Sequence, residues 1–157
     1  MKQKRILVAV DYSSCSAGAL QLAATLAAKL DATLDVVHVW DRPSYVSDVV
    51  MTRSEPVSGK SLIRMIQENA QKDLDAFLAS AQLPAGIPLT SRLIAGEPAS
   101  SLLHALQQGQ FDLVVTGTHG RTGLSHLLLG SVAEKLVRMS PVPVLTVPDE
   151  AAQKLRG

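Results

Sequence analysis

The amino-acid sequence predicts one α/β domain in which five parallel strands form a single doubly wound sheet with helices on both faces. The first observation is that short aliphatic runs alternate with amphipathic stretches along the chain. The second is that clusters of glycine, proline and polar residues separate these segments. Strands joined through helices pair in parallel with right-handed crossovers, so a Rossmann-like sheet with strand order 3-2-1-4-5 is expected.

The first expected strand is Arg5 to Val10, an uninterrupted aliphatic run typical of a strand that is buried on both faces. The polar cluster from Asp11 to Ser16 follows it and offers hydroxyl groups that cap helix N-termini. Alanines and leucines then recur on one face of the expected helix as far as Leu30. Thr33 to Trp40 is the second expected strand.

The next segment, 41–59, has two prolines, four serines and no sustained periodicity, so we expect a flexible loop there. A loop of this length is unusual inside a compact domain. Lys60 to Ala81 is expected to be a helix, because its apolar residues recur at spacings of three and four. That helix should pack flat on the sheet.

The third expected strand is Leu89 to Ile94, although two polar residues interrupt its apolar pattern. A helix should follow it, because Pro98 suits the first helical position and three leucines after it share one face. Gly109 is expected to end that helix.

The fourth expected strand is Phe111 to Thr116, and a glycine-rich segment separates it from a last helix over Ser131 to Met139. The fifth is Val142 to Val147. Pro143 and Pro148 place it at an edge of the sheet, because a proline removes a donor from the hydrogen-bond ladder.

Composition limits the classes of function. A formal net charge of only +1 gives no electrostatic reason to expect a nucleic acid or an anionic membrane as a partner. No apolar run reaches the length of a signal-peptide core or a membrane span. The one cysteine, Cys15, has no internal disulfide partner, which favours a reducing cytoplasm. We expect residues 1–150 to form the domain and 151–157 a short tail.

A binding site in such a sheet is expected where the winding direction reverses, in the crevice at the carboxyl ends of strands one and four. Asp11 directly follows the first strand, and Gly117-Thr-His-Gly120 directly follows the fourth. The fold therefore brings together two segments that are far apart in the sequence.

The glycines continue into a helix N-terminus, since Gly130 and Ser131 stand ten residues beyond Gly120. Ser131 with Glu134 has the spacing of a capping box. Glycines let the backbone approach a ligand closely, and free amides at a helix start donate hydrogen bonds to phosphate. Arg121 adds a cation, and the Ser131 hydroxyl could ligate a magnesium ion that bridges the phosphates. The pattern thus predicts a polyphosphate site.

Each of these features also has a purely structural interpretation. Glycines after a strand are often turn residues, and both Asp11 and Ser131 are residue types that cap helices. His119 and His126 could act as bases, but no nucleophile or carboxylate stands at a recognisable spacing from either. Cys15 near a helix start could be reactive, although a small buried thiol is the simpler interpretation.

The segment from Gly117 to Lys135, followed by Pro141 to Val147, resembles the C-terminal signature of universal stress proteins. The Ile-Leu-Val-Ala-Val-Asp11 start, the Val-Val-His-Val39 strand and the Gly-Glu-Pro-Ala99 turn also match. The resemblance spans nearly the whole chain, and the glycine pattern is that of the ATP-binding branch of this family.

The resemblance implies that the protein binds ATP, or AMP or ADP, with Mg2+ accompanying the nucleotide. Asp11 and the backbone at Val39 would hold the adenosine. The phosphates would lie against a second set of residues, namely Gly117, Gly120, Arg121, Gly130, Ser131 and Val132. Family members form homodimers through the edge strand, which corresponds to Val142 to Val147 here.

We therefore expect an ATP-binding regulator of the stress response that acts through conformation or partner binding. A slow ATPase or nucleotide hydrolase is the second hypothesis, because a bound Mg-triphosphate needs only a positioned water to react. A nucleotide-free interaction domain is the third. A flavodoxin-like or receiver-like module has the same strand pattern, but the chain has few aromatic residues and no acidic cluster around Asp11.

Overall fold

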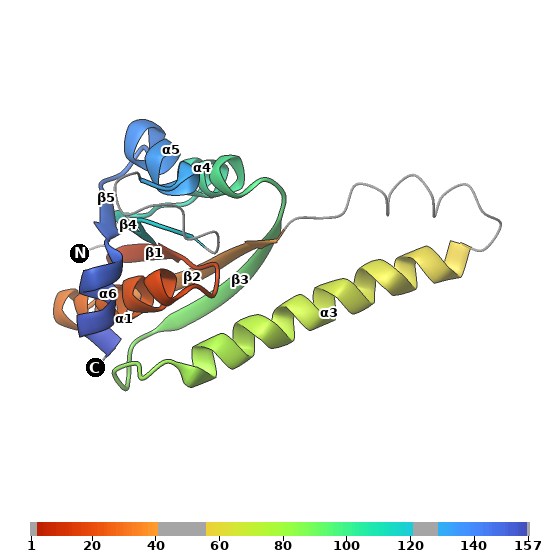
Figure 1. The fold of residues 1–157 in the computed structure, drawn as a ribbon, viewed down its shortest axis with the longest axis horizontal. Helices are drawn as coiled ribbons and strands as arrows, with labels where there is room; N and C mark the ends of the chain where they lie inside the picture. Colours follow the sequence, from red (N-terminus) through yellow and green to blue (C-terminus); the bar gives the residue numbers. More distant parts are fainter. Residues whose placement is uncertain (1–2, 41–55, 121–128, 157) are drawn as a thin grey trace.

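A computed structural model describes residues 3–40, 56–120 and 129–156 of the chain. Its centre is one parallel sheet of five strands in the order β3-β2-β1-β4-β5, which confirms the predicted fold and strand order (Figure 1). The strands are β1 (Arg5–Ala9), β2 (Thr33–Trp40), β3 (Leu89–Ala95), β4 (Leu113–Gly117) and β5 (Val144–Val147). The helices are α1 (Ser14–Leu30), α3 (Pro56–Ser80), α4 (Pro98–Gln108), α5 (Ser131–Met139) and α6 (Asp149–Arg156).

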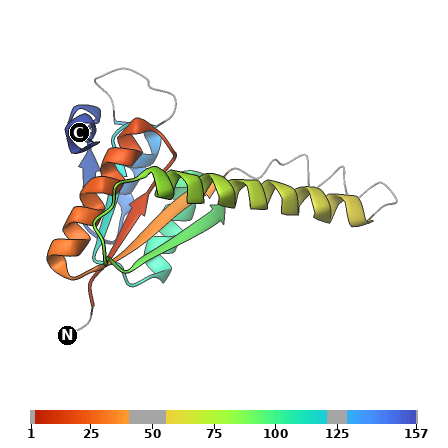
Figure 2. The ribbon, with the colours of Figure 1, turned by 90° about the horizontal axis from the view of Figure 1, so that it is seen from below.

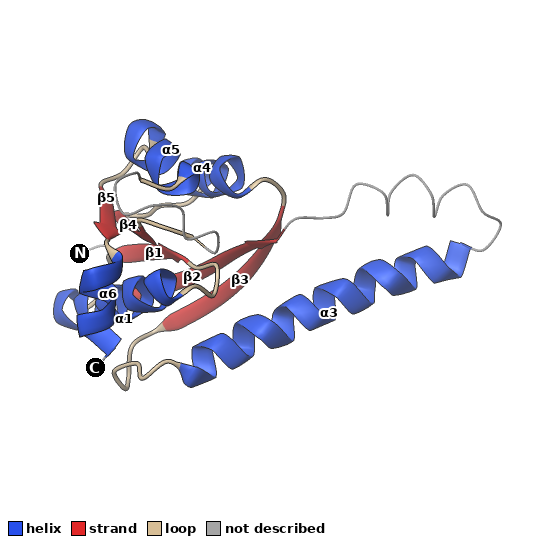
Figure 3. Cartoon of the chain, in the orientation of Figure 1, coloured by secondary structure: helices blue, strands red, loops and turns tan. Residues whose placement is uncertain are grey.

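Helices cover both faces of the sheet, as expected for a doubly wound fold. Figure 3 shows α1, α3 and α6 on one side of the strands and α4 and α5 on the other. Each face has its own apolar core: Ile6 and Val8 of β1 pack towards α1, whereas Leu7 packs towards α4 and α5. Consecutive residues of a strand point to opposite faces, so the continuous aliphatic run of β1 supplies both cores at once.

The helix ends follow capping rules at most positions. Ser13 is the N-cap of α1, and its side chain accepts a hydrogen bond from the Ser16 N–H at 3.1 Å. Glu97 caps α4, whose first residue is Pro98, and Gly109 is the C-cap as predicted. These caps fix where each helix leaves the carboxyl end of the preceding strand.

The start of α5 differs from the predicted capping box. The N-cap is Gly130 and not Ser131, and no side chain caps the helix. The Gly130 N–H donates to the Thr118 carbonyl at 2.7 Å. This hydrogen bond holds Gly130 at the N-cap position, one residue before the N-cap that the capping box predicts. Helical geometry therefore begins at Ser131, and the first-turn amides of α5 receive no capping hydroxyl.

The prediction of a loop over 41–59 is wrong for its last four residues, which belong to α3. Residues 41–55 lie outside the described part of the chain, but residues 56–59 belong to α3, which begins at Pro56. Proline is favoured in the first turn of a helix, so the residue that suggested a loop is the one that starts the helix. The C-terminal half of α3 packs beside the sheet and its N-terminal half projects beyond it (Figure 2). Among the described helices, none is long and apolar enough to span a membrane.

The C-terminal segment also differs from the expected tail, because residues 149–156 form helix α6. Ala152 of α6 is completely buried against α1. Gly18 of α1 allows this close approach, since a Cβ atom added there would overlap Ala152. The Ser14 hydroxyl donates to the Asp149 carboxylate at 3.2 Å and joins the starts of the two helices.

The contact between α1 and α6 predicts the effect of Gly18→Ala. The added methyl group overlaps Ala152, so we expect the substitution to lower the free energy of unfolding by about 1–3 kcal/mol. Urea unfolding of the two proteins measures this difference. In a chain that ends at Pro148 the same substitution should be neutral or stabilising, because alanine favours helix over glycine. Equal destabilisation in both backgrounds would contradict the assigned contact.

Candidate functional site

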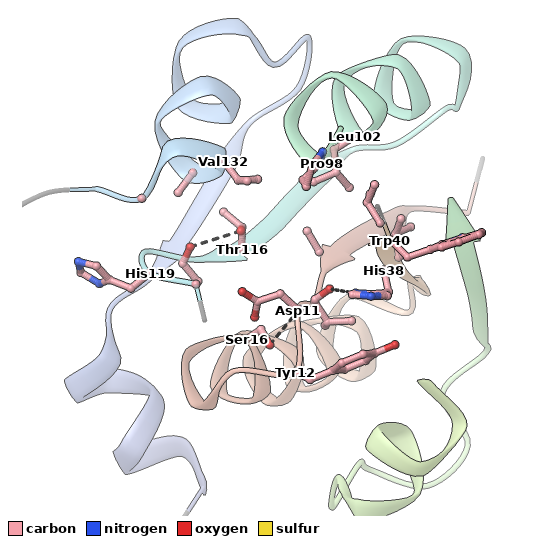
Figure 4. Close-up of a pocket in the computed structure, with 18 of the residues that line it drawn as sticks. Asp11, Tyr12, Ser16, His38, Trp40, Pro98, Leu102, Thr116, His119 and Val132 are labelled. Atoms are coloured by element: carbon pink, nitrogen blue, oxygen red, sulfur yellow. Dashed lines mark hydrogen bonds between the residues drawn. The ribbon is translucent and has the colours of Figure 1, made fainter. Parts of the chain in front are cut away.

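A cavity of about 700 Å³ opens at the carboxyl ends of β1, β2 and β4, where the winding direction of the sheet reverses (Figure 4). Its floor is formed by the last residues of these strands and the residues that follow β1 and β4, and its walls by the first turns of α4 and α5 and by one face of α3. Its volume falls in the range of small-molecule sites, about 300–1,000 Å³. The crevice predicted between strands one and four is therefore present.

Asp11 lies in the tight turn between β1 and α1. Its Oδ1 atom accepts a hydrogen bond from the Ser13 N–H at 3.0 Å and another from the Ser13 hydroxyl. Tyr12 between them has a left-handed backbone with φ of 67°, which turns the chain sharply into the helix. The Oδ2 atom lies on the Gly120 side of the cavity, where a Cβ built on Gly120 would be only 2.8 Å away.

A glycine is required at each of the three predicted positions, but for different structural reasons. A Cβ on Gly130 would lie 3.0 Å from the Thr118 carbonyl oxygen, and one on Gly120 would meet Asp11, so both keep backbone close to the cavity. A Cβ on Gly117 would instead lie 2.8 Å from the Cys15 sulfur. Gly117 lines the cavity, but the close packing of β4 against α1 already requires a glycine there.

The β2 side of the cavity is built from Val39 and an ordered histidine. The His38 Nδ1 atom lies 2.8 Å from the Val10 carbonyl oxygen, and since a carbonyl only accepts, Nδ1 carries the proton. The Tyr12 ring stacks on the His38 ring with centroids 4.3 Å apart. Figure 4 shows these two rings together below the cavity, where they fix the end of β2 relative to the turn after β1.

His119 and Cys15 both lie beside the Thr118 hydroxyl, whose oxygen is 3.9 Å from the Cys15 sulfur. The His119 Nδ1 atom lies 3.0 Å from the Thr118 hydroxyl, and its Nε2 atom is buried with no hydrogen-bond partner in the described chain. Cys15 is 3% exposed and its thiol donates to the Val147 carbonyl at 3.1 Å, which confirms the interpretation as a small buried thiol. Over the described ranges, no group of three or more His, Cys, Asp or Glu residues could hold a metal ion.

The charges around the cavity are unusual for a polyphosphate site. The described lining residues include two carboxylates, those of Asp11 and Asp73, and no lysine or arginine. Positive potential comes from the uncapped N-terminus of α5 at Ser131 and Val132, where the helix dipole and free amides point outward. Arg121 and His126 lie outside the described residues.

Seven of the eight predicted site residues line this one cavity, and Arg121 lies in a range that the structure does not describe. Sequence reasoning missed the wall contributed by α4 and α3. Pro98 and Leu102 come from the first turns of α4, and Asn69 and Asp73 come from α3. The spacing of four between Asn69 and Asp73 puts them on one helix face, but nothing in the sequence relates that face to the cavity.

The fold and the cavity define a class of protein: a doubly wound parallel α/β domain with a ligand-sized cavity at its topological switch point. A family model described as the universal stress protein family matches residues 2–148. The chain therefore belongs to the universal stress protein family, as its sequence motifs predict.

Relatives match over almost the whole chain. A universal stress protein of Methanocaldococcus jannaschii is 31% identical over 144 residues, which cover 92% of this chain and 81% of the relative. The universal stress protein YxiE of Bacillus subtilis is 33% identical over 146 residues, which cover 91% of this chain and 97% of YxiE.

Solved structures share the fold. A universal stress protein in complex with cAMP has a TM-score of 0.61 and 21% identity, covering 95% of this chain and 99% of its own. The universal stress protein from Archaeoglobus fulgidus in complex with dAMP has a TM-score of 0.59 and 20% identity, covering 94% and 99%.

One carboxylate beside the cavity has a shifted pKa. Glu97 accepts hydrogen bonds from the Ser100 hydroxyl at 2.6 Å, the Ser100 N–H at 2.8 Å and the Ala99 N–H at 3.2 Å. The Lys135 ammonium lies 3.8 Å away. These groups, the Ser100 hydroxyl above all, lower the pKa of Glu97 from 4.5 to about 2. The cap that places Pro98 in the cavity wall thus depends on an ionised carboxylate.

This pKa predicts how Glu97→Gln changes stability with pH. A carboxylate whose pKa is lower in the folded state stabilises the fold above its unfolded pKa of 4.5, and that contribution is lost as the pH falls to about 2. The variant should be less stable than the wild type at neutral pH, with the difference shrinking through this window. Urea midpoints across the acid range measure it.

Ser100→Ala is the matched control, because it keeps the carboxylate and removes the strongest cause of its low pKa. Like Glu97→Gln, it should make the free energy of unfolding depend less on pH in the acid range. A stability difference between Glu97→Gln and wild type that stays constant from neutral to acid pH would contradict the assignment.

Proposed function

We propose that this protein binds an adenine nucleotide, ATP with Mg2+, in the cavity at the carboxyl ends of β1 and β4. The observation that carries this proposal is the meeting of close-approaching backbone at Gly120 and Gly130, an uncapped helix N-terminus and the Asp11 carboxylate in one cavity. The universal stress proteins solved with cAMP and dAMP support an adenine nucleotide as the class of ligand.

The chemistry of the cavity gives the nucleotide a direction. The Asp11 carboxylate suits ribose hydroxyls, because its Oδ2 atom lies towards Gly120 while Oδ1 is held by Ser13. The backbone of Val39 at the end of β2 suits the edge of the base. The phosphates would then lie towards the amides of Gly130, Ser131 and Val132 at the start of α5.

Magnesium fits this arrangement for an electrostatic reason. With Asp11 and Asp73 as the charged side chains of the described lining, a triphosphate would meet a negative wall. A bound Mg2+ supplies neutralisation of the phosphate oxygens. The Ser131 hydroxyl is the side chain that would hold it, and Arg121 is the expected additional cation.

The function that follows is regulatory. The nucleotide would act by favouring one surface conformation that a partner protein distinguishes from the other. This makes the protein a nucleotide-responsive component of the stress response in the cytoplasm. There are two alternative functions. The first is a slow ATPase, and the second is an interaction domain that binds no nucleotide.

Thermal unfolding with and without Mg-ATP tests the nucleotide proposal. Ligand at a hundredfold excess over its Kd should stabilise the fold by about 2.7 kcal/mol, a rise in Tm of roughly 5–10 °C for a domain of this size. Gly120→Val should abolish the rise, because its side chain would enter the space next to Asp11. AMP without Mg2+ should give a smaller shift and FMN none.

The matched control is Thr25→Val, an exposed change on α1 outside the cavity, which should keep the full shift. If no nucleotide raises the Tm of protein freed of bound nucleotide, the interaction-domain alternative stands. Phosphate release that is fast in wild type and absent in Gly120→Val would instead favour the ATPase.

We also propose that two copies form a homodimer through the free edge of β5. The carbonyls of Pro143 and Val147 bond to β4, so the amides and carbonyls of Val144 and Thr146 face away from the sheet. Val137 and Met139 on the adjoining helix α5 are 52% and 64% exposed. An outward ladder beside exposed apolar side chains suits antiparallel pairing with a second copy.

Thr146→Pro tests the dimer, because proline removes an outward N–H while the bonds from β5 to β4 remain. We expect the wild type to sediment as a dimer and the variant as a monomer in analytical ultracentrifugation. Thr25→Val serves again as the control that should stay dimeric. A monomeric wild type, or a variant that remains dimeric, would contradict pairing through β5.

A further inference from the structure

A second cavity, of about 580 Å³, lies between β3 and α4 on the sheet face opposite α1. It arises because β3 is the edge strand and α4 packs over the next two strands, β2 and β1, while α3 packs on the other face of β3. This cavity shares no lining residue with the nucleotide cavity. We call it the α4 groove, defined by Arg5, Arg92, Ile94, Ser101, His104 and Phe111 among its lining residues.

The strand register brings Arg92 into this groove. Arg92 pairs with Val37, and Ile94 pairs with Val39. Val37 and Val39 belong to the core under α4, so the alternating residues of β3 on this face also point towards α4. Leu93, between Arg92 and Ile94, packs into the opposite core. Arg92 is therefore an exposed residue of the edge strand, on the sheet face that α4 covers.

Two guanidinium groups converge on one aromatic ring at the base of the groove. The Cζ atom of Arg5 lies 4.6 Å from the Phe111 ring centroid and that of Arg92 lies 5.9 Å away. Phe111 is only 7% exposed, whereas Arg92 is exposed to solvent. The charge of Arg5 is balanced by Asp35 at 2.8 Å, whereas no carboxylate in the described ranges lies within 4.0 Å of Arg92.

The opposite wall of the groove adds hydrogen-bonding groups without adding negative charge. Ser101, His104 and Gln108 of α4 line it, and none of its described lining residues is acidic. Ile94 and Ala105 give it apolar surface between these groups. The groove thus combines one unbalanced cation, polar groups of α4 and apolar surface from Ile94 and Ala105.

We propose that the α4 groove binds a small organic anion, in which a carboxylate or phosphate is attached to an apolar, preferably aromatic, body. The guanidinium of Arg92 receives the oxyanion, because its planar set of N–H donors matches two oxygen atoms at once. The Ser101 hydroxyl and the His104 ring are the further donors. The body of the ligand lies on Ile94 and Ala105, which lose exposed apolar surface when it binds.

Titration with phenyl phosphate and with benzoate, followed by amide chemical shifts in NMR, tests the proposal and separates the two oxyanion sources. At least one of them should bind with a Kd on the order of 1 mM or tighter. The shifts should fall on Arg92, Ser101 and Gln108. Inorganic phosphate should bind more weakly because it lacks the body, and benzylamine should not bind because its charge has the wrong sign.

Variants of Arg92 decide the outcome. Arg92→Met keeps the apolar stem and removes the charge, so it should raise the Kd about tenfold or more. Arg92→Lys keeps the charge and loses the planar donors, and should cause a smaller loss. Arg138→Met, on an exposed arginine of α5 that is paired with Glu134, is the matched control and should leave the Kd unchanged.

The proposal is overturned if benzylamine binds as well as phenyl phosphate and benzoate, or if neither anion binds. It is also overturned if Arg92→Met keeps the wild-type affinity with an unchanged Tm, since Arg92 would then only cover the apolar face of an edge strand. Shifts confined to Asp11 and Gly130 would place the anion in the nucleotide cavity and likewise contradict the groove.

Discussion

The pairing of β1 with β4 on one side and β2 on the other is the constraint on which the rest of the molecule depends. The chain winds outward from β1 in both directions, and right-handed crossovers then send the connecting helices to opposite faces. The ends of β1 and β4 are therefore not covered by one continuous connection, and a cavity remains there. Asp11 and Gly120 meet because of this topology and not because of any contact near in sequence.

Local sequence patterns were sufficient to predict an element where its residues favour only one type of structure. The strand Thr33–Trp40 was predicted to the residue, and Pro98 marked the start of α4 correctly. Local sequence patterns failed where the same residues are compatible with two types of structure. Pro56 suits both a loop and a helix start, and the polar residues from Asp149 onward suit both a tail and a surface helix. The helix α6 is held by its contact with Gly18, which no local pattern contains.

The residues of the candidate site likewise fall into those that could be predicted from the sequence and those that could not. Asp11 and the glycines could be placed together because they follow strands whose carboxyl ends meet at the point where the winding of the sheet reverses. Asn69 and Asp73 could not, because their position depends on how α3 crosses the sheet. Gly117 lies in the cavity, and packing against Cys15 is by itself a sufficient reason for a glycine there, so its contact with a ligand stays a prediction.

Helix α4 has a property that follows from its position between two cavities. Pro98 and Leu102 line one of them, and Ser101 and His104 line the other, so the two walls are successive faces of one rigid element. Thermodynamic linkage then applies in both directions: any displacement of α4 by one ligand changes the affinity for the second by the same factor that the second imposes on the first. A single helix of eleven residues thus connects the walls of the two cavities.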